Sequence, residues 1–459
     1  MKKLVALLLV AMMLCASMAA LAETPEGYPE VVPGIDLGGQ KLFIYDYWSS
    51  SSNDRKAEPT EEEQAQYDYR DWIMATYNVQ IEQVAKGDWG SNATELVNFK
   101  DAPDGTLALF ILPPDFVGGP LANGYLAAWN HNDLVDLNDT EKWNAAMVDF
   151  MTLGDSIYGV STGALEPRGC LYFNKRVLEE AGIDWHTIYD MQQEGTWTWA
   201  AFEEMCAKIQ KDTDNDGITD IWAMTGSNVD LYRVAVYNNG GSFFGKTDDG
   251  KLTITANSDN TLEALDWCKH MWETYAFQGI PDENGSVQWD YYKDAWKQGF
   301  CGFYVYQTYG GFNDNSEMAD MADEWGCVAI PAGPSGNGTL LHVASENVTV
   351  IPACYDDDTI AKMAFIYSLW SDATPGYDDE DSWIQNKFDY TDDRAVLETY
   401  AMLRDAAHAV LDPVLYLGSV NDVEGQDYLW ELMNKTPQEM YETKLPSWEG
   451  LVNAFNANK

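Results

Sequence analysis

Short apolar runs alternate with amphipathic stretches along the first part of the chain. KLFIYD at 41–46 lies between a glycine pair and the polar SSSSND, which predicts a buried strand. Residues 61–77 place aromatic and apolar side chains near helical spacing, and NVQIEQV at 78–84 predicts a second strand. LALFIL at 107–112 is a third apolar strand and ends at two prolines. This order predicts an α/β lobe with a largely parallel sheet, whose ligand crevice lies beyond the carboxyl ends of the strands.

The alternation continues towards the C-terminus. LYFN at 171–174 predicts a strand, followed by a helix over 175–181 that ends at Gly182, and Thr198 is the expected cap of the helix WAAFEEMCAKIQK. Further helices are predicted over 260–274, 289–298 and 360–370, and further strands over 301–305, 325–330 and 348–351. From Asp392 the chain is predicted to be mostly helical, with breaks at Pro413 and Pro437.

No internal repeat or long linker separates these elements, so two lobes joined by several crossings are expected rather than two independent domains. The expected division is a signal peptide over 1–22, the first part of lobe 1 over 23–157, the first part of lobe 2 over 158–331, a return to lobe 1 over 332–390, and C-terminal helices mainly in lobe 2 over 391–459.

The N-terminus has the pattern of a secretory signal peptide. Two lysines precede an apolar run, and ALA at 20–22 is the small-x-small sequence that signal peptidase recognises. We therefore expect a secreted, extracytoplasmic protein that begins at Glu23. A lipid anchor on Cys15 is the alternative, but Leu14 precedes it where a lipoprotein signal requires a small residue, which argues against anchoring.

The charge balance argues against two classes of partner. The chain has 27 Lys and Arg against 74 Asp and Glu, a formal net charge of −47 at pH 7. This charge repels phosphate backbones and anionic lipid headgroups, which argues against binding to nucleic acids or membrane surfaces. The acids are spread along the chain, as in a well-solvated surface. The seven cysteines include no CxxC pair and the five histidines have no metal-binding spacing, so no disulfide scaffold or histidine metal site is expected.

Several longer segments occur in a characteristic order. They are SIYGVSTG from 156, LYFNKRVLEEAGID from 171, TWTWAAFEEMCAKIQKDTDNDGITDIWAMTG from 196, WKQGFCGFYV from 296, WGCVAIPAGPSGNG from 325, and VTVIPACYDDDTIAKMAFIYSLW from 348. In order and spacing the chain resembles family 1 of the extracellular solute-binding proteins of ABC transporters, which includes maltose- and multiple-sugar-binding proteins. The strand from Gly299 to Val305 is bulkier at its end than is usual in that family.

The resemblance implies a two-lobed, periplasmic-binding-protein-like α/β fold of type II. Each lobe would have a mixed, mostly parallel sheet flanked by helices, and the ligand cleft between the lobes would close on its ligand. No catalysis is implied. Because binding residues vary widely within the family, the ligand itself is not carried over.

Sugar recognition needs flat aromatic faces for the C–H faces of pyranose rings and planar polar groups for the hydroxyls. We expect these residues where predicted strands end. The candidates are Tyr47 and Trp48, Asp115 and Phe116, Glu166 and Arg168, Tyr304 and Tyr306, and Glu346 and Asn347. A core position is the open alternative for Tyr47 and Trp48, and an ion-pair or hinge role is the alternative for Arg168.

An acidic loop, DTDNDGITD at 212–220, has the oxygen pattern of a calcium loop, with a glycine at its sixth position. Its expected ligands are Asp212, Asp214, Asp216, the carbonyl of Ile218, and Asp220. Ala223 stands where a bidentate glutamate would complete the shell, so either another part of the fold supplies a carboxylate or the loop is a solvated acidic turn. Structural calcium would stiffen one lobe without touching the ligand, and no other cofactor is expected.

The sequence therefore predicts a monomeric binding protein that captures a carbohydrate, either a sugar or an oligosaccharide, and delivers it to the permease of an ABC importer. Two alternatives remain. A secreted carbohydrate-active enzyme would also have cleft aromatics, and it would need two carboxyl groups about 5 to 10 Å apart. No GxSxG, HExxH, P-loop or strand-linked GxGxxG motif supports catalysis. A ligand-sensing binding protein for a sensor kinase would use the same features.

Overall fold

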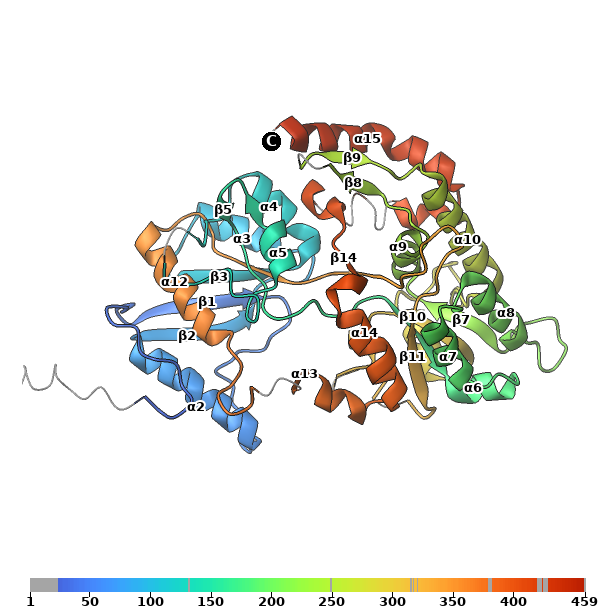
Figure 1. Cartoon of the computed structure of the whole chain (residues 1–459), viewed down its shortest axis with the longest axis horizontal. Helices are drawn as coiled ribbons and strands as arrows, with labels where there is room; N and C mark the ends of the chain where they lie inside the picture. The colour runs from blue at the N-terminus through green and yellow to red at the C-terminus, as the bar shows by residue number, and fades with distance from the viewer. Residues whose placement is uncertain are drawn as a thin grey trace, which may run out of the picture.

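The computed structural model describes residues 24–457 apart from 131–132, 248–249, 314–315, 317, 320, 379–381, 419–422 and 424–427. The expected signal peptide and Cys15 lie outside these residues. The chain forms two lobes, each built around a four-stranded sheet, with the N-terminal lobe on the left of Figure 1 and the second lobe on the right. The predicted two-lobed α/β architecture is confirmed.

The sheet of lobe 1 has the strand order β13-β3-β1-β2. Strands β1 (Gln40–Asp46), β2 (Val79–Ala85) and β3 (Leu107–Leu112) run parallel, as predicted. Strand β13 (Val348–Val350) comes from much later in the chain and pairs antiparallel with β3. Lobe 1 is therefore assembled from two distant stretches of sequence.

Helices cover both faces of this sheet. Alternate residues of β1 point to opposite faces, so Leu42 and Ile44 pack with α2 (Glu61–Thr76) and α12 (Asp357–Trp370), while Tyr45 packs on the other side with α3 (Asn92–Asp101). Helix α2 begins with a capping box, in which the Thr60 side chain accepts from the Glu63 amide and the Glu63 carboxylate accepts from the Thr60 amide. Figure 1 shows the orange α12 seated on the blue lobe.

The sheet of lobe 2 has the order β11-β6-β10-β7, formed by β6 (Cys170–Asn174), β7 (Trp222–Gly226), β10 (Cys301–Tyr306) and β11 (Trp325–Ala329). Only β10 and β7 run parallel, because β6 is antiparallel to both of its neighbours. The expectation of a mixed sheet is confirmed, but the expectation that it is mostly parallel is wrong for this lobe. Every residue of β6 and β11 is buried, and a continuous apolar run fits either strand direction.

Helices surround the second sheet. They are α6 (Lys175–Glu180), α7 (His186–Glu194), α8 (Trp199–Ile209), α9 (Asn228–Asn238), α10 (Asp259–Tyr275) and α11 (Tyr291–Lys297). The predicted cap of α8 is confirmed, since the Thr198 side chain accepts from the Ala201 amide. A small hairpin, β8 (Phe244–Lys246) and β9 (Leu252–Ile254), and the helices α7 and α9 are additions that the sequence pattern did not predict.

The C-terminal part is largely helical, as predicted. It contains a π-helical turn at Ala395–Tyr400, α14 (Ala401–Arg404), a 3-10 helix at Pro413–Leu417 and α15 (Pro437–Ala457). Pro413 and Pro437 stand at the first positions of helices, where a missing N–H costs nothing.

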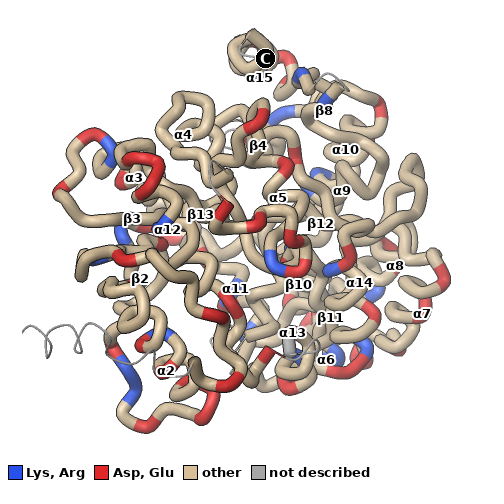
Figure 2. Tube along the Cα trace, turned by 60° about the vertical axis from the view of Figure 1, so that its left-hand side comes forward, with Lys and Arg blue, Asp and Glu red and all other residues tan. Residues whose placement is uncertain are grey.

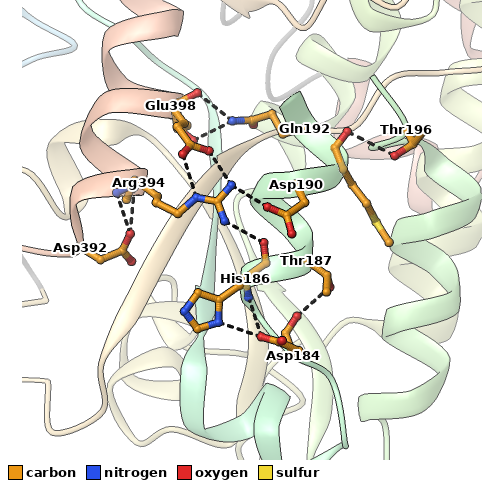
Figure 3. A network of polar contacts seen from close by, with 12 residues as sticks. Asp184, His186, Thr187, Asp190, Gln192, Thr196, Asp392, Arg394 and Glu398 are labelled. Atoms are coloured by element: carbon orange, nitrogen blue, oxygen red, sulfur yellow. Dashed lines mark hydrogen bonds and ion pairs between the residues drawn. The ribbon is translucent and has the colours of Figure 1, made fainter. Parts of the chain in front are cut away.

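An arginine network fixes this C-terminal part to lobe 2 (Figure 3). The Arg394 guanidinium donates to Glu398 at 2.8 Å and to Asp190 of α7 at 2.9 Å, and it also reaches the His186 carbonyl at 3.2 Å. Because Asp190 and His186 lie far from Arg394 in sequence, the network joins two distant segments of the same lobe.

Three segments lie side by side between the lobes. The amide of Glu166 donates to the Glu346 carboxylate at 2.6 Å, and the amide of Arg168 donates to His342 Nδ1 at 3.2 Å. Strand β12 (His342–Val343) also pairs in parallel with β14 (Ala409–Val410), which lies between the lobes in Figure 1. We call these three segments that lie between the lobes the hinge.

Acidic residues occur on loops and helices of both lobes and are not gathered in one segment (Figure 2). The six described cysteines are free, and all except Cys354 are buried. No helix within the described ranges is both long and apolar enough to cross a membrane.

Candidate functional site

Two adjoining cavities lie between the lobes. The outer one has a volume of about 500 Å³ and the inner one about 60 Å³. Four residues line both cavities: Asp115, Asp230, Arg233 and Gln307. The two cavities therefore form one cleft with a wide outer part and a narrow inner chamber.

Aromatic side chains dominate the outer part of the cleft. They are Trp89, Trp272, Trp289, Tyr291, Tyr292, Tyr306, Tyr309 and Trp430. Trp289 and Trp430 stack face to face, with ring centroids 4.9 Å apart and planes at 5°, and they remain 59% and 41% exposed. Exposed indoles in a cleft offer flat apolar faces to a ligand.

The end of β10 places two of these rings. Tyr306 is its last residue, and its hydroxyl lies 2.9 Å from the Tyr309 hydroxyl in the 3-10 turn that follows. The absence of a side chain at Gly310 lets this turn pack against the Tyr306 ring, since a Cβ there would lie 2.5 Å from the ring. Tyr304, two residues earlier, is only 1% exposed, stacks on Trp296 and does not line the cleft. The structure thus separates two tyrosines that the sequence had paired as candidates.

Lobe 1 contributes the other wall of the cleft. Asp115 lies in the 3-10 turn Pro114–Phe116 that directly follows β3. Phe116 makes an edge contact with Trp89, with centroids 4.7 Å apart, and so supports that ring at the outer cavity. Of the two candidates at this strand end, Asp115 lines the cleft and Phe116 contacts a residue that lines it.

Tyr47 and Trp48 follow β1 but line neither cavity. The Asp46 carboxylate stabilises the turn that contains both residues, since it accepts from the Trp48 and Ser49 amides. The Tyr47 hydroxyl donates to the Asn347 side chain at 2.9 Å, and burial raises the pKa of Tyr47. Trp48 is 53% exposed and rests edge-on against Tyr47.

Glu166, Glu346 and Asn347 belong to the hinge. The Glu166 carboxylate accepts from Arg404 at 2.7 Å and from the Tyr400 hydroxyl at 2.6 Å. Glu346 accepts from the Glu166 amide, and burial raises the pKa of the Glu346 carboxyl. These candidates join the segments that cross between the lobes, and none of them lines the cavities.

The inner chamber gathers charged residues from four segments. Asp115 comes from lobe 1, Asp230 and Arg233 from the first turns of α9, Arg168 from the hinge, and Asp412 from the start of the 3-10 helix Pro413–Leu417. Asp230 and Arg233 share one face of α9 because they are three residues apart.

Burial is the main influence on these carboxyls. It raises the pKa of Asp115, Asp230 and Asp412, and the nearby Arg233 opposes that rise in each case. The Arg168 guanidinium lies 5.8 Å from the centre of the Tyr309 ring and opposes the rise at Asp115 and Asp230. The chamber is thus a polar end to an otherwise aromatic cleft.

Some lining residues had signals that the sequence reading did not use. Trp89 follows β2, so the strand-end rule would have found it. Asp230 and Arg233 follow β7, which was not predicted as a strand. Trp289 and Trp430 lie in separate loops far apart in sequence, and no local pattern points to their stacking.

The acidic loop lies between α8 and β7, and its ligand atoms are partly assembled. Carboxylate oxygens of Asp212, Asp214 and Asp216 all lie within 4.8 Å of one another. The Asp220 carboxylate instead accepts from the Thr213 amide at 2.7 Å. The structure therefore brings three of the four expected carboxylate ligands together.

A family model described as bacterial extracellular solute-binding protein matches residues 77–368. No curated protein sequence matches the chain.

Many solved structures share its fold. The GacH receptor of Streptomyces glaucescens, solved unliganded and with acarbose, has a TM-score of 0.61 at 15% identity, over 90% of this chain and 99% of that chain. UgpB from Mycobacterium tuberculosis, solved with glycerophosphocholine, has a TM-score of 0.61 at 15% identity, over 89% and 98%. Lmo0181 from Listeria monocytogenes, an ABC substrate-binding protein solved with cycloalternan, has a TM-score of 0.59 at 15% identity, over 91% and 99%. At these identities the likeness shows a common fold and leaves the ligand open.

Proposed function

Since the chain belongs to the bacterial extracellular solute-binding proteins, we propose that it binds a sugar or oligosaccharide in the interlobe cleft outside the cytoplasm and delivers it to the permease of an ABC importer. The protein acts as a monomer and does not transform its ligand.

The aromatic lining of the outer cavity carries this proposal. Its volume of about 500 Å³ lies within the range of about 300 to 1,000 Å³ that is typical of small-molecule sites. Its eight aromatic residues provide ring faces, and the inner chamber provides carboxylate and guanidinium groups for hydroxyls. The GacH receptor and Lmo0181 were solved with acarbose and cycloalternan, which supports a carbohydrate, whereas UgpB was solved with glycerophosphocholine.

Thermal unfolding of the chain from residue 23 onward, against a panel of monosaccharides, oligosaccharides, amino acids and peptides, tests the proposal. A ligand at 100 times its dissociation constant should add about 2.7 kcal/mol of stability. Stabilisation by one class of sugar, with the sugar recovered unchanged, is the expected result. Stabilisation by no sugar would refute carbohydrate binding, and release of sugar products would support the enzyme alternative.

Hinge closure is a second part of the proposal. Both lobes contribute cleft residues, so a ligand that contacts both favours the closed state. Small-angle scattering should show a more compact protein at saturating ligand. An unchanged profile would exclude closure.

A further inference from the structure

The charged side chains of the cleft are confined to its inner end. Among the described residues, the only charged ones that line the outer cavity are Asp115, Asp230 and Arg233, and all three also line the inner chamber. A ligand that lies along the aromatic walls therefore presents one end to this chamber.

Among the described residues that line the chamber, the carboxyl groups outnumber the guanidinium groups by one. The described part of its lining contains three carboxyl groups, those of Asp115, Asp230 and Asp412, and two guanidinium groups, those of Arg168 and Arg233, with no lysine or histidine. Arg233 acts on all three carboxylates, so its charge is already shared. Arg168 acts on Asp115 and Asp230 and also on Glu346. Each guanidinium therefore interacts electrostatically with more than one carboxyl group.

The described lysine near the cleft, Lys293, does not balance the third carboxyl group of the chamber. The Lys293 ammonium lies 5.7 Å from the centre of the Tyr306 ring, but it is paired with Asp290 at 3.6 Å and lines neither cavity. A metal ion is also disfavoured, because among the described residues only Asp212, Asp214 and Asp216 form a group of three that could hold one. The charge balance thus favours an organic cation.

The chamber is too small for a sugar ring. Its volume is about 60 Å³, and one water needs roughly 10–15 Å³ of such space. It admits a few waters or one small functional group of a ligand whose ring lies in the aromatic part of the cleft.

We propose that the inner chamber selects ligands that carry a protonated amine, such as an unacetylated amino sugar, over the same sugars with a hydroxyl, and rejects those with a carboxylate. This inference rests on the proposed carbohydrate-binding function. An ammonium group balances the chamber's charge and donates up to three charge-assisted hydrogen bonds to its carboxylates. A carboxylate would instead bring a further negative charge close to three carboxyl groups in a poorly solvated site.

Matched sugar triplets test the inference. They are glucose, glucosamine and glucuronate, the corresponding galactose and mannose sets, and oligomers of each, measured by isothermal titration on the chain from residue 23 onward. In the series that binds, the amine should bind roughly tenfold more tightly than the hydroxyl, as expected for a hydrogen bond to a charged group, and the carboxylate should bind least.

The variants Asp230→Asn and Asp115→Asn each remove one chamber carboxylate, and either should abolish the preference for the amine. Two variants are used so that a folding defect in one does not decide the test. Asp259→Asn is the matched control, because Asp259 lies in the first turn of α10 as Asp230 does in α9, but it is exposed and away from the cleft. It should keep the preference.

Two outcomes would overturn the inference alone: equal binding of amine and hydroxyl members, or tightest binding of the carboxylate member. Absence of binding by every triplet would refute carbohydrate binding itself, and the charge preference with it.

Discussion

Gly118 of lobe 1 lies against the backbone of Leu415 so closely that a Cβ at position 118 would stand 2.3 Å from the Leu415 carbonyl oxygen. Gly118 begins α4 (Gly118–Ala122), and Leu415 lies in the C-terminal 3-10 helix Pro413–Leu417. Phe150 and Tyr416 make a second contact nearby, with ring centroids 4.5 Å apart. The C-terminal part therefore packs directly on lobe 1, beside the chamber that Asp412 lines.

Gly118→Ala should force the backbone of α4 away from that of Leu415. Because backbone atoms cannot yield as a flexible side chain does, we expect a loss of about 1–3 kcal/mol in the free energy of unfolding, together with a larger radius of gyration in scattering. Gly119→Ala is the control, since a Cβ there meets nothing within 4 Å. Equal stability and size of the two variants would show that the contact is not maintained in solution.

Trp289→Ala should weaken sugar binding roughly tenfold or more and change the unfolding temperature little, because Trp289 is exposed and stacks only at the cleft. Tyr304→Ala is the contrasting variant. Its ring is buried against Trp296, so its loss should cost about 3–5 kcal/mol of stability, as for other large aromatic residues in cores. Isothermal titration with the bound sugar measures the affinity of both variants, and thermal unfolding measures their stability. Full affinity of Trp289→Ala would remove the stacked indoles from the site.

His342 should make stability depend on pH. Its Nδ1 accepts from the Arg168 amide in the hinge, and burial lowers the pKa of the imidazole to about 4. Below the unfolded value of about 6.5 the unfolded chain binds a proton that the folded chain does not. The contribution of His342 is therefore complete above pH 6.5 and is lost as the pH falls towards 4, by about 3 kcal/mol in total.

The measurement is denaturant unfolding of the wild type and of His342→Asn across this pH range. The difference in stability between the two proteins should change by this amount between neutral and acid pH. A difference that is the same at every pH would contradict a buried neutral imidazole.

Calcium in the acidic loop stays a prediction of the sequence. If the carboxylates of Asp212, Asp214 and Asp216 hold the ion, Ca²⁺ should raise the unfolding temperature, a chelator should reverse the rise, and Asp214→Asn should abolish it. Asp259→Asn provides a charge-matched control outside the loop. An unfolding temperature that does not respond to Ca²⁺ would leave the loop as a solvated acidic turn.

The sequence predicted best what depends on local periodicity. KLFIYD and LALFIL alternate or run apolar between clear turn residues, so β1 and β3 were found within a residue of their observed ends. The Thr198 cap also depends on adjacent residues alone. The direction of β6 was not recoverable, because a strand buried on both faces carries no directional signal.

The residues that line the cleft show the same contrast between local sequence patterns and contacts made only in the folded chain. Asp115 and Tyr306 were found because they end predicted strands, and Arg168 because it follows a crossing segment. Trp289 and Trp430 meet only through the tertiary fold. Glu346 resembles a ligand residue in sequence, but its carboxylate already accepts the Glu166 amide.

The position of β13 has a consequence for how the protein is made. Val348 of β13 pairs with Leu112 of β3, so one edge of β3 stays unpaired until most of the chain has been synthesised. Until then the LALFIL strand has an open, apolar edge of the kind that recruits other chains into aggregates. Lobe 1 can therefore complete its sheet only after every strand of the lobe 2 sheet has emerged.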